Sequence, residues 1–436
     1  MKMNIKKYAL IALAAVAITA CKKNNEVENI DALAQGKDTK LSLTVTAPNG
    51  ITTYAGEDDN ATDAETKINK LDVFVYDDGA PFSLVSHTQI TGDTLIYVSG
   101  TSNLKTQTVN VKTGSKRVFV GVNLSPAIVA KLVANYANMN TALDVDMSTL
   151  VNRDGSVAMF NERITRINIT ENAATNVVTV PVSRLVAKAS ARSGQALSLT
   201  GIAGGNLSDL NYSVGQANTK QFIAPLTNLR DPNWLASELT STDLSLVRTA
   251  DFRAVNAYAV TNVNQNKHYF AENTSSEHQN NQVTYLSVRA TFTPTRLSGT
   301  APITNGTFYA VFTNAGVYYF GSLAEAQAFA AANNGAAPIT YTNGYAYYRL
   351  YLNPQGGYDV LRNVYYHATI TKINGLGTSG ENQIDGEPGT PGNPGTPIEP
   401  SRPSRPTDPI RPSTNVNIEA TISIVPWTMH TADYEI

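Results

Sequence analysis

The sequence predicts an all-β protein, and three observations support this fold class. Short runs of alternating apolar and polar residues recur along most of the chain, separated by turn-forming Asn, Gly, Pro and Ser, which is the pattern of half-buried strands. Tyrosine occurs 21 times and threonine is abundant, and both residue types favour pleated surfaces. Charged residues are only 16% of the 436 residues, so Lys- and Glu-rich helix surfaces are scarce, while 42% hydrophobic residues can fill sizeable cores.

Residues 1–21 have the features of a bacterial lipoprotein signal peptide. Lysines near the start precede an apolar run, Tyr8 to Ile18, that is too short to span a bilayer but has the length of a signal h-region. The run ends in Ile-Thr-Ala-Cys, which has the form of a lipobox and predicts cleavage between Ala20 and Cys21. We expect Cys21, the only cysteine, to carry a lipid that anchors the protein to the outer membrane. The alternative is an ordinary signal peptide followed by an incidental cysteine.

A polar tether at residues 22–39 leads into a first domain, expected over residues 40–190. Its first strand is the clearest, because Leu41, Leu43 and Val45 alternate with Ser and Thr. Apolar residues at helical spacing behind a proline predict a helix over Pro126–Asn138. Further strands are expected at Lys70–Tyr76, Thr94–Val98, Thr106–Val111, Arg117–Leu124, Arg163–Ile169, Asn176–Pro181 and Leu185–Ala191.

A second domain is expected over residues 191–375, with one short helix at Leu323–Ala332. Strands at this spacing, with turn signals between them, are typical of β-sandwiches. They are expected at Ala254–Val260, Thr284–Thr293, Thr307–Thr313, Val317–Phe320, Tyr345–Leu352 and Val364–Ile373.

The composition then changes to a linker rich in Gly and Pro over residues 376–414. Its Gly-x-Pro triplets are too few for a collagen helix, so a semi-rigid spacer that reaches on the order of 100 Å is the better interpretation. The last segment, residues 415–436, carries a strong strand pattern. A lone strand is not stable in water, so this one must pair with a sheet of its own chain or of another. Its apolar positions are Val416, Ile418, Ala420, Ile422 and Ile424, followed by Trp427.

Several classes of function are disfavoured. The formal net charge of −2 offers no basic excess for nucleic acid. No nucleophile elbow or phosphate loop is present, and no cofactor is expected. The histidines lack metal-ligand spacing, so no metal site is expected. Acid pairs are better explained as solvated loops, and the tyrosine run Tyr341–Tyr351 as sandwich packing rather than a sugar-binding face. The histidines are His87, His268, His278, His367 and His430. The acid pairs are Asp58 with Asp59 and Asp144 with Asp146.

In this order, behind a lipobox, the segments resemble the Bacteroidales-type fimbrillins, the lipoprotein-derived subunits of major and minor fimbriae. The match spans nearly the whole chain. The matching segments are Ile68–Tyr76, Arg117–Leu124, Arg184–Lys188, Tyr269–Asn273, Thr284–Pro294, Leu361–Tyr366 and Ile422–Trp427.

The resemblance implies two transthyretin-like β-sandwich domains in tandem and polymerisation by strand exchange. A protease would remove the first strand, with Leu41, Leu43 and Val45, and a neighbour's C-terminal strand would fill the groove. A sheet that lacks a strand exposes unpaired backbone groups and an apolar trough, and an added strand satisfies both. The partners would be other copies of the chain or related fimbrial subunits.

The expected maturation loop departs from the family pattern of cleavage after arginine. The matching position is near Tyr54 and Ala55, and no Lys or Arg lies between Lys40 and Lys67. Three alternatives follow: another protease cuts, a flanking lysine such as Lys67 serves, or the subunit stays uncut and anchors a fibre.

The sequence therefore favours a non-enzymatic pilus subunit that supports adhesion and biofilm formation. The competing hypothesis is a surface lipoprotein that binds a glycan or a host protein, in which the last strand folds back into its own sheet.

Overall fold

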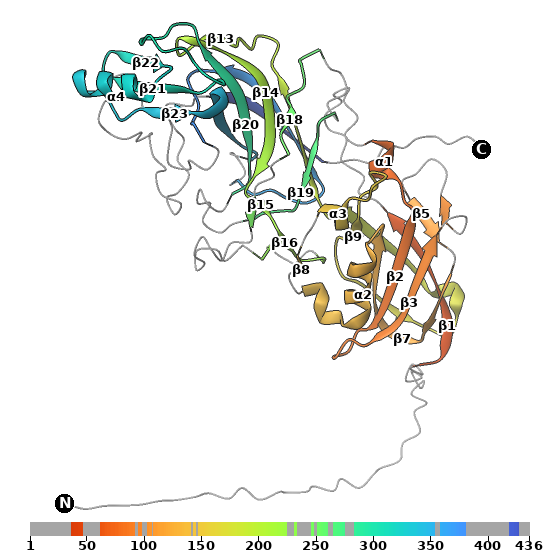
Figure 1. Ribbon diagram of the computed structural model, residues 1–436. Coiled ribbons are helices and arrows are strands. Elements are labelled where there is room, and N and C mark those ends of the chain that lie inside the picture. The colour runs from red at the N-terminus through yellow and green to blue at the C-terminus, as the bar shows by residue number, and fades with distance from the viewer. Residues whose placement is uncertain are drawn as a thin grey trace, which may run out of the picture.

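The computed structural model describes residues 36–46, 62–91, 95–97, 103–106, 108–140, 143–144, 147–224, 231–232, 246–247, 251–259, 265–274, 283–353, 358–380 and 418–426. Strands dominate these ranges, and the few helices are short, which confirms the all-β expectation (Figure 1). The longest helix has ten residues, and no helix within the described ranges is long and apolar enough to cross a membrane.

Ten of the described strands form one sheet in the N-terminal half of the chain. Its principal order is β3-β2-β7-β9-β11-β1-β5-β4, with β10 beside β7 and β6 beside β1. The strands are β1 (Asp38–Thr46), β2 (Lys70–Asp77), β3 (Leu84–Thr91), β4 (Leu95–Tyr97), β5 (Asn103–Thr106), β6 (Val109–Lys112), β7 (Gly114–Val122), β9 (Met159–Asn161), β10 (Thr165–Ile169) and β11 (Val177–Arg184). Alternation places Val73 and Val75 on one face, in a core with the apolar side of β1, and Phe74 and Tyr76 on the other face.

Helix α2 (Pro126–Ala134) covers the face that carries Phe74 and Tyr76. Ser125 caps its first turn, and Pro126 suits a position where the N–H would be unpaired. Leu132 is buried against this face, and its carbonyl accepts a hydrogen bond of 2.6 Å from Tyr76. The helix ends earlier than expected, and a 3₁₀ turn (Tyr136–Asn140) follows.

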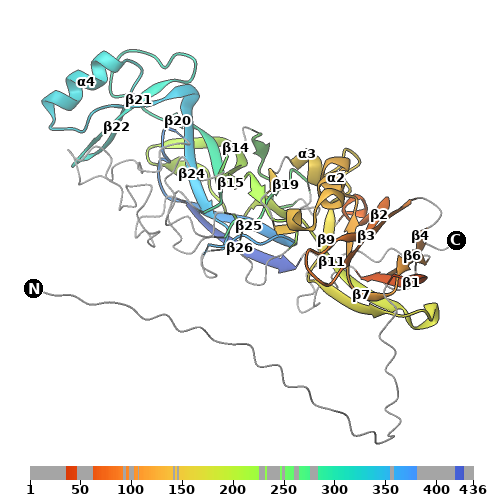
Figure 2. The same cartoon turned by 90° about the horizontal axis from the view of Figure 1, so that it is seen from below.

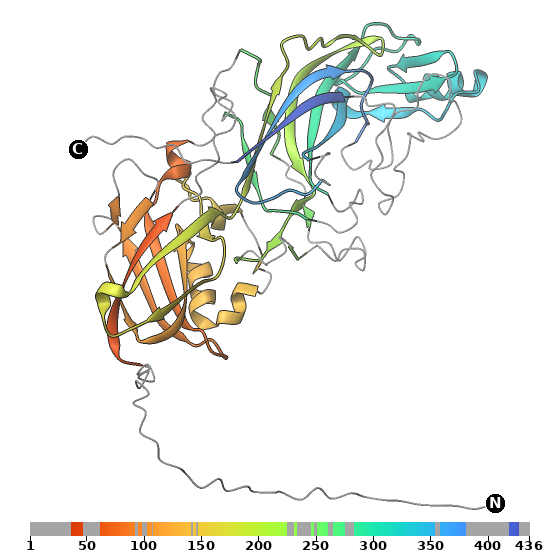
Figure 3. The same ribbon diagram turned by 180° about the vertical axis from the view of Figure 1, so that it is seen from behind.

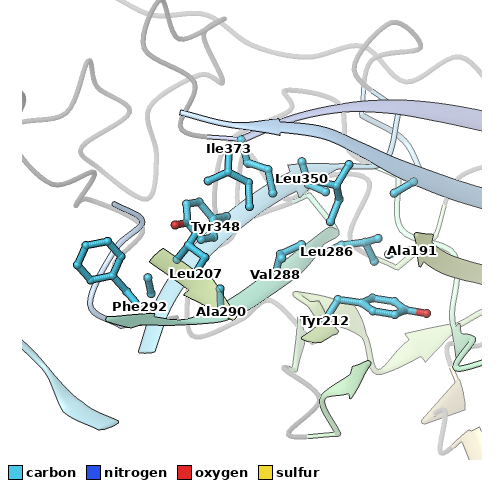
Figure 4. Close-up of a cluster of buried hydrophobic side chains, with 14 of the residues drawn as sticks. Ala191, Leu207, Tyr212, Leu286, Val288, Ala290, Phe292, Tyr348, Leu350 and Ile373 are labelled. Atoms are coloured by element: carbon cyan, nitrogen blue, oxygen red, sulfur yellow. The ribbon is translucent and has the colours of Figure 1, made fainter. Parts of the chain in front are cut away.

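Two further sheets face each other in the C-terminal half and enclose the largest core (Figure 4). Ala191 and Ile373 contribute from one sheet, and Leu286, Val288 and Leu350 from the other. The first sheet has the order β19 (His268–Phe270), β12 (Ala187–Ser193), β25 (Val364–Ile373) and β26 (Ile418–Pro426). The second has the order β13 (Thr200–Ile202), β14 (Gly205–Gly215), β20 (Tyr285–Pro294) and β24 (Tyr345–Tyr351), with β18 (Arg253–Ala254) beside β14.

A small sheet projects from the far end of this half (Figure 2). It has the order β22 (Gly316–Phe320), β21 (Phe308–Thr313), β23 (Ile339–Tyr341) and is packed by α4 (Leu323–Ala332). The remaining elements are short. They are α1 (Asp63–Thr66), α3 (Met147–Leu150), β8 (Leu143–Asp144) paired with β16 (Lys220–Gln221), β15 (Ala217–Asn218) paired with β17 (Leu246–Val247), and the 3₁₀ turns Ala173–Thr175 and Thr342–Gly344.

Two expected strands differ from the structure. The run Thr106–Val111 is divided between β5 and β6, and of the described part of the run Ala254–Val260, residues 254–259, only Ala254 lies in a strand. The central strand β14 was not predicted from the sequence. Its residues (GNLSDLNYSVG) are rich in Gly and polar side chains, so the apolar alternation is weak, and its pairing with β20 holds it in place.

Candidate functional site

Strand β1 lies inside the N-terminal sheet, with neighbours on both of its edges (Figure 3). Along one edge it runs parallel to β11, where Leu43 pairs with Val178 and Val45 with Val180. Along the other edge it pairs antiparallel with β6 and then with β5. Removal of β1 would therefore leave two rows of unpaired backbone groups, one on each side of a single slot.

The apolar face of β1 is completely enclosed. Leu41, Leu43 and Val45 are at most 1% exposed, and they pack in one core with residues such as Met159 and Val180. Burial of a side chain of this size stabilises the fold by about 1.5–3 kcal/mol. The slot that β1 fills is thus an apolar trough, and its opposite face carries the half-buried Ser42 and Thr44.

One asparagine holds the beginning of β1 in register. The side-chain amide of Asn176 donates to the carbonyl of Lys40 at 3.0 Å, and the Asn176 carbonyl accepts from the N–H of Ser42 at 2.9 Å. Lys37, just before β1, forms an ion pair with Glu171 at 2.5 Å. Both side chains are more than half exposed, so this pair contributes little to stability.

Strand β26 forms the end of its sheet and pairs antiparallel with β25 along its whole length (Figure 2). Ile418 is 3% exposed, and Ala420 and Ile422 pack against the core that Ile418 enters. Ile424 lies opposite Tyr366 in the register. Glu419, Thr421 and Ser423 are exposed, so the strand has one apolar face. Val416 and Trp427 lie outside the described residues.

The beginning of the linker is fixed to the edge of β24. The Tyr348 hydroxyl donates to the carbonyl of Gly375 at 3.0 Å, and the Tyr341 hydroxyl donates to that of Gly377 at 2.9 Å. Tyr347 and Thr378 exchange two backbone hydrogen bonds of 2.8 Å. Two tyrosines of the run Tyr341–Tyr351, which was expected to pack the sandwich, thus bind the beginning of the linker.

A buried cluster of charges lies between β1 and β2 in the sequence, at α1. Glu65 of α1 is 0% exposed and accepts hydrogen bonds from Lys188 of β12 at 3.1 Å, from Lys267 at 2.6 Å and from Tyr269 of β19 at 2.5 Å. Burial raises the pKa of Glu65, but the attraction of Lys188 and Lys267 outweighs burial and lowers that pKa to about 2. Burial lowers the pKa of Lys188 to about 7 despite the attraction of Glu65. The cluster joins α1 to the first sheet of the C-terminal half.

Sequence patterns do not predict Glu65 as a site residue, although a local signal exists at this position. Thr62 and Glu65 form a capping box: the Thr62 hydroxyl accepts from the N–H of Glu65, and the Glu65 carboxylate accepts from the N–H of Thr62 at 2.7 Å. This motif predicts a helix start, but it does not predict burial. The nearby Lys67 has a side chain that is 58% exposed and lies 3.7 Å from Asp154.

The other residues considered from the sequence do not gather into a site. His87 contacts Asp72 at 3.0 Å, His268 contacts the carbonyl of Tyr212, and His367 contacts Ser190 at 2.7 Å, on three separate strands. Among the described residues, no three His, Cys, Asp or Glu side chains form a group that could hold a metal ion. Outside the described residues lie Ala20, Cys21, Tyr54, Ala55, Asp58, Asp59, Asp146, His278 and His430.

Comparison with known proteins gives a consistent result. Residues 39–221 match the model of the family "Major fimbrial subunit protein (FimA)", and residues 339–433 match "Major fimbrial subunit protein type IV, Fimbrillin, C-terminal". The two matches together cover more than half of the chain. Two curated sequences named minor fimbrium subunit Mfa1, both from Porphyromonas gingivalis, are 28% and 27% identical to the chain over the full length of each protein.

Two solved structures from the same organism are also similar. The crystal structure of a fimbrilin (FimA) of P. gingivalis W83 has 15% identity and a TM-score of 0.47, and the match covers 90% of this chain and 99% of that one. The tip fimbrial protein Mfa3, with a C-terminal truncation, has 15% identity and a TM-score of 0.41, and the match covers 90% of this chain and 100% of that one.

Proposed function

This chain belongs to the Bacteroidales-type fimbrial subunits and is a structural subunit of a cell-surface fimbrium, not an enzyme, and from this premise we propose that it assembles by strand exchange through β26. In the proposed reaction, β26 leaves β25 and enters the β1 slot of a neighbouring subunit. The partner is another copy of this chain or a related fimbrial subunit, and the resulting fibre serves adhesion and biofilm formation.

The observation that carries the proposal is the position of β26. It is an end strand with a single described neighbour, and the 44 residues from 374 to 417 separate it from the strand with which it pairs. An antiparallel pair can be joined by a turn of two to five residues. A Pro-rich connection of this length is therefore unnecessary within the subunit, but it lets β26 reach another molecule.

The slot and the strand have matching patterns. In β1 the apolar positions Leu41, Leu43 and Val45 recur at every second residue, and in β26 the positions Ile418, Ala420 and Ile422 do the same. A donated strand thus restores backbone pairing on both sides of the slot and fills its trough.

We also propose export as a lipoprotein, with the lipid on Cys21 and the mature protein on the outer membrane. The lipobox sequence is the support for this step.

We further propose two domains that meet between Arg184 and Ala187, because β11 pairs in the N-terminal sheet and β12 pairs with β25. The boundary expected near residue 190 would divide β12.

A non-polymerising or anchoring lipoprotein, which binds a glycan or a host protein, is a second candidate. It is favoured by one observation: β26 is folded back onto its own sheet, as that hypothesis requires. An anchoring subunit that retains β1 would still donate β26 to a neighbour but would accept no strand.

The test compares the intact chain, recovered from the cell surface, with a variant that lacks residues 418–436. Strand exchange predicts a ladder of very stable oligomers for the intact chain and a folded monomer for the truncated one. Ile422→Asn should weaken the ladder, whereas Thr421→Asn on the exposed face should not. Ladders that persist without residues 418–436 would exclude β26 as the donor, and an intact chain that stays monomeric would favour the second candidate.

A further inference from the structure

Residues 62–69, which lead into β2, are held from both sides by buried groups. On one side, Glu65 receives hydrogen bonds from Lys188, Lys267 and Tyr269, as described above. These donors come from β12 and from β19 and the residue before it, more than 120 positions along the chain. Removal of the Glu65 carboxylate would break its buried ion pair with Lys188, whose side chain is 0% exposed.

On the other side, Asn123 holds the peptide bond that follows Lys67. The side-chain amide of Asn123 donates to the carbonyl of Lys67 at 2.7 Å, and its side-chain oxygen accepts from the N–H of Asn69 at 2.8 Å. Asn123 is 1% exposed, and Ile68, on the far side of that bond, is 8% exposed and belongs to the core that contains β1. The side chain of Lys67 reaches solvent, but its carbonyl is bound by Asn123 and the next residue is buried.

These two sets of contacts bear on proteolysis. A protease binds several consecutive residues in an extended form, so cleavage of a folded chain requires that the segment first open locally. Opening around Lys67 would withdraw Glu65 from its donors, break both contacts with Asn123 and expose Ile68. The exposed side chain of Lys67 therefore does not indicate that the bond between Lys67 and Ile68 can be cut.

We propose that Glu65 is a latch that protects the Lys67–Ile68 bond and ties residues 62–68 to strands β12 and β19. A protease specific for Lys or Arg then leaves this bond intact in the folded subunit. The protection is a property of the chain itself. Its consequence for assembly rests on the proposed function: residues 62–68 stay in the mature subunit, and Lys67 does not serve as the flanking lysine for the release of β1.

The preceding lysine in the sequence, Lys40, is protected in an equivalent way. The Lys40 carbonyl accepts from Asn176, and Leu41, which follows it, is 0% exposed within β1. Because no Lys or Arg lies between Lys40 and Lys67, cleavage specific for these residues does not separate β1 from the rest of the folded chain.

Trypsin digestion of the purified full chain, followed by mass spectrometry, tests the latch. The wild-type chain should be cut after Arg296, which is exposed and lies outside the strands just after the end of β20, and not after Lys67. Glu65→Gln should increase the rate of cutting after Lys67 at least about tenfold, because one partner of a buried ion pair is lost. Tyr269→Phe, which keeps the ring and removes one hydrogen bond to a charged group, should increase that rate about fivefold or more.

Two controls separate the latch from general destabilisation. Glu171→Gln makes the same chemical change in the exposed pair with Lys37 and should leave cutting after Lys67 unchanged. Cutting after Lys116 of the central strand β7, with a side chain 5% exposed, reports global unfolding and should not rise in Tyr269→Phe.

Wild-type cutting after Lys67 at the rate for Arg296 would overturn the proposal. So would an unchanged Lys67 rate in both variants. Neither result would affect strand exchange, which is judged by the oligomers of the chain without residues 418–436.

Discussion

Ile373 and Ile418 lie directly opposite each other at one end of the antiparallel pair β25–β26, although 44 residues separate them in the sequence. Both side chains are buried, at 2% and 3% exposure, and they enter the same core. A tight turn could join these two residues. The long connection raises the entropic cost of bringing them together by only a small amount, because loop-closure entropy grows slowly with length. The linker is therefore compatible with a stable monomer and still gives β26 a long reach.

Shortening the linker should separate monomer stability from polymerisation. Deletion of residues 385–408 should raise the free energy of unfolding of the monomer by less than about 1 kcal/mol, since a shorter loop is easier to close. It should also remove the oligomer ladder, because the strand no longer reaches a neighbour. Urea denaturation and gel electrophoresis measure the two effects. A variant with residues 385–408 in scrambled order is the control, and loss of its ladder would show that sequence, not reach, is what matters.

The apolar face of β26 should contribute to the stability of the monomer. Ile418→Ala leaves a cavity beside Ile373 and should lower the free energy of unfolding by about 2–4 kcal/mol. Thr421→Ala, on the exposed face of the same strand, should change it by no more than about 0.5 kcal/mol. Chemical denaturation of both variants checks this. Equal effects would mean that β26 does not dock on β25 in solution.

The trough around β1 provides a test of which strand fills it in the fibre. Leu43→Ala should destabilise the monomer by about 2–5 kcal/mol, because Leu43 is 1% exposed in a close-packed core. If β1 is removed during assembly, the same substitution should leave the thermal stability of isolated fibres unchanged. Thr44→Ala serves as the control on the opposite face. Destabilised fibres would show instead that β1 remains in the subunit.

The Glu65 cluster should make stability depend on pH in the acid range. Because the pKa of Glu65 is about 2 in the folded chain and 4.5 in the unfolded chain, the unfolded state binds the proton more tightly. The stabilising contribution is complete above pH 4.5 and is lost as the pH falls toward 2, with a total of about 3 kcal/mol. The difference in free energy of unfolding between wild type and Glu65→Gln should shrink over this interval. A constant difference from pH 6 to 2.5 would contradict the assignment.

Strands with strong alternation could be predicted from the sequence, and strands without it could not. Leu41, Leu43 and Val45 indicated β1, and the run Val364–Ile373 coincides with β25, because each pattern lies within a few consecutive residues. Strand β14 carries Gly, Asn, Ser and Asp where apolar residues are expected, and its place depends on its pairing with β20. Local patterns do not report such pairing.

Some features of the candidate site could likewise be predicted from the sequence, and others could not. The apolar positions of β1 and β26 and the Pro-rich linker between the last two strands are visible in the sequence, since each is a property of neighbouring residues. The position of β26 against β25, the enclosure of β1 between β11 and β6, and the burial of Glu65 were decided by the fold. A glutamate in an acidic stretch is ordinarily solvated. Glu65 is buried because Lys188, Lys267 and Tyr269, from distant strands, surround it, and contacts over such separations exist only once the sheets have formed.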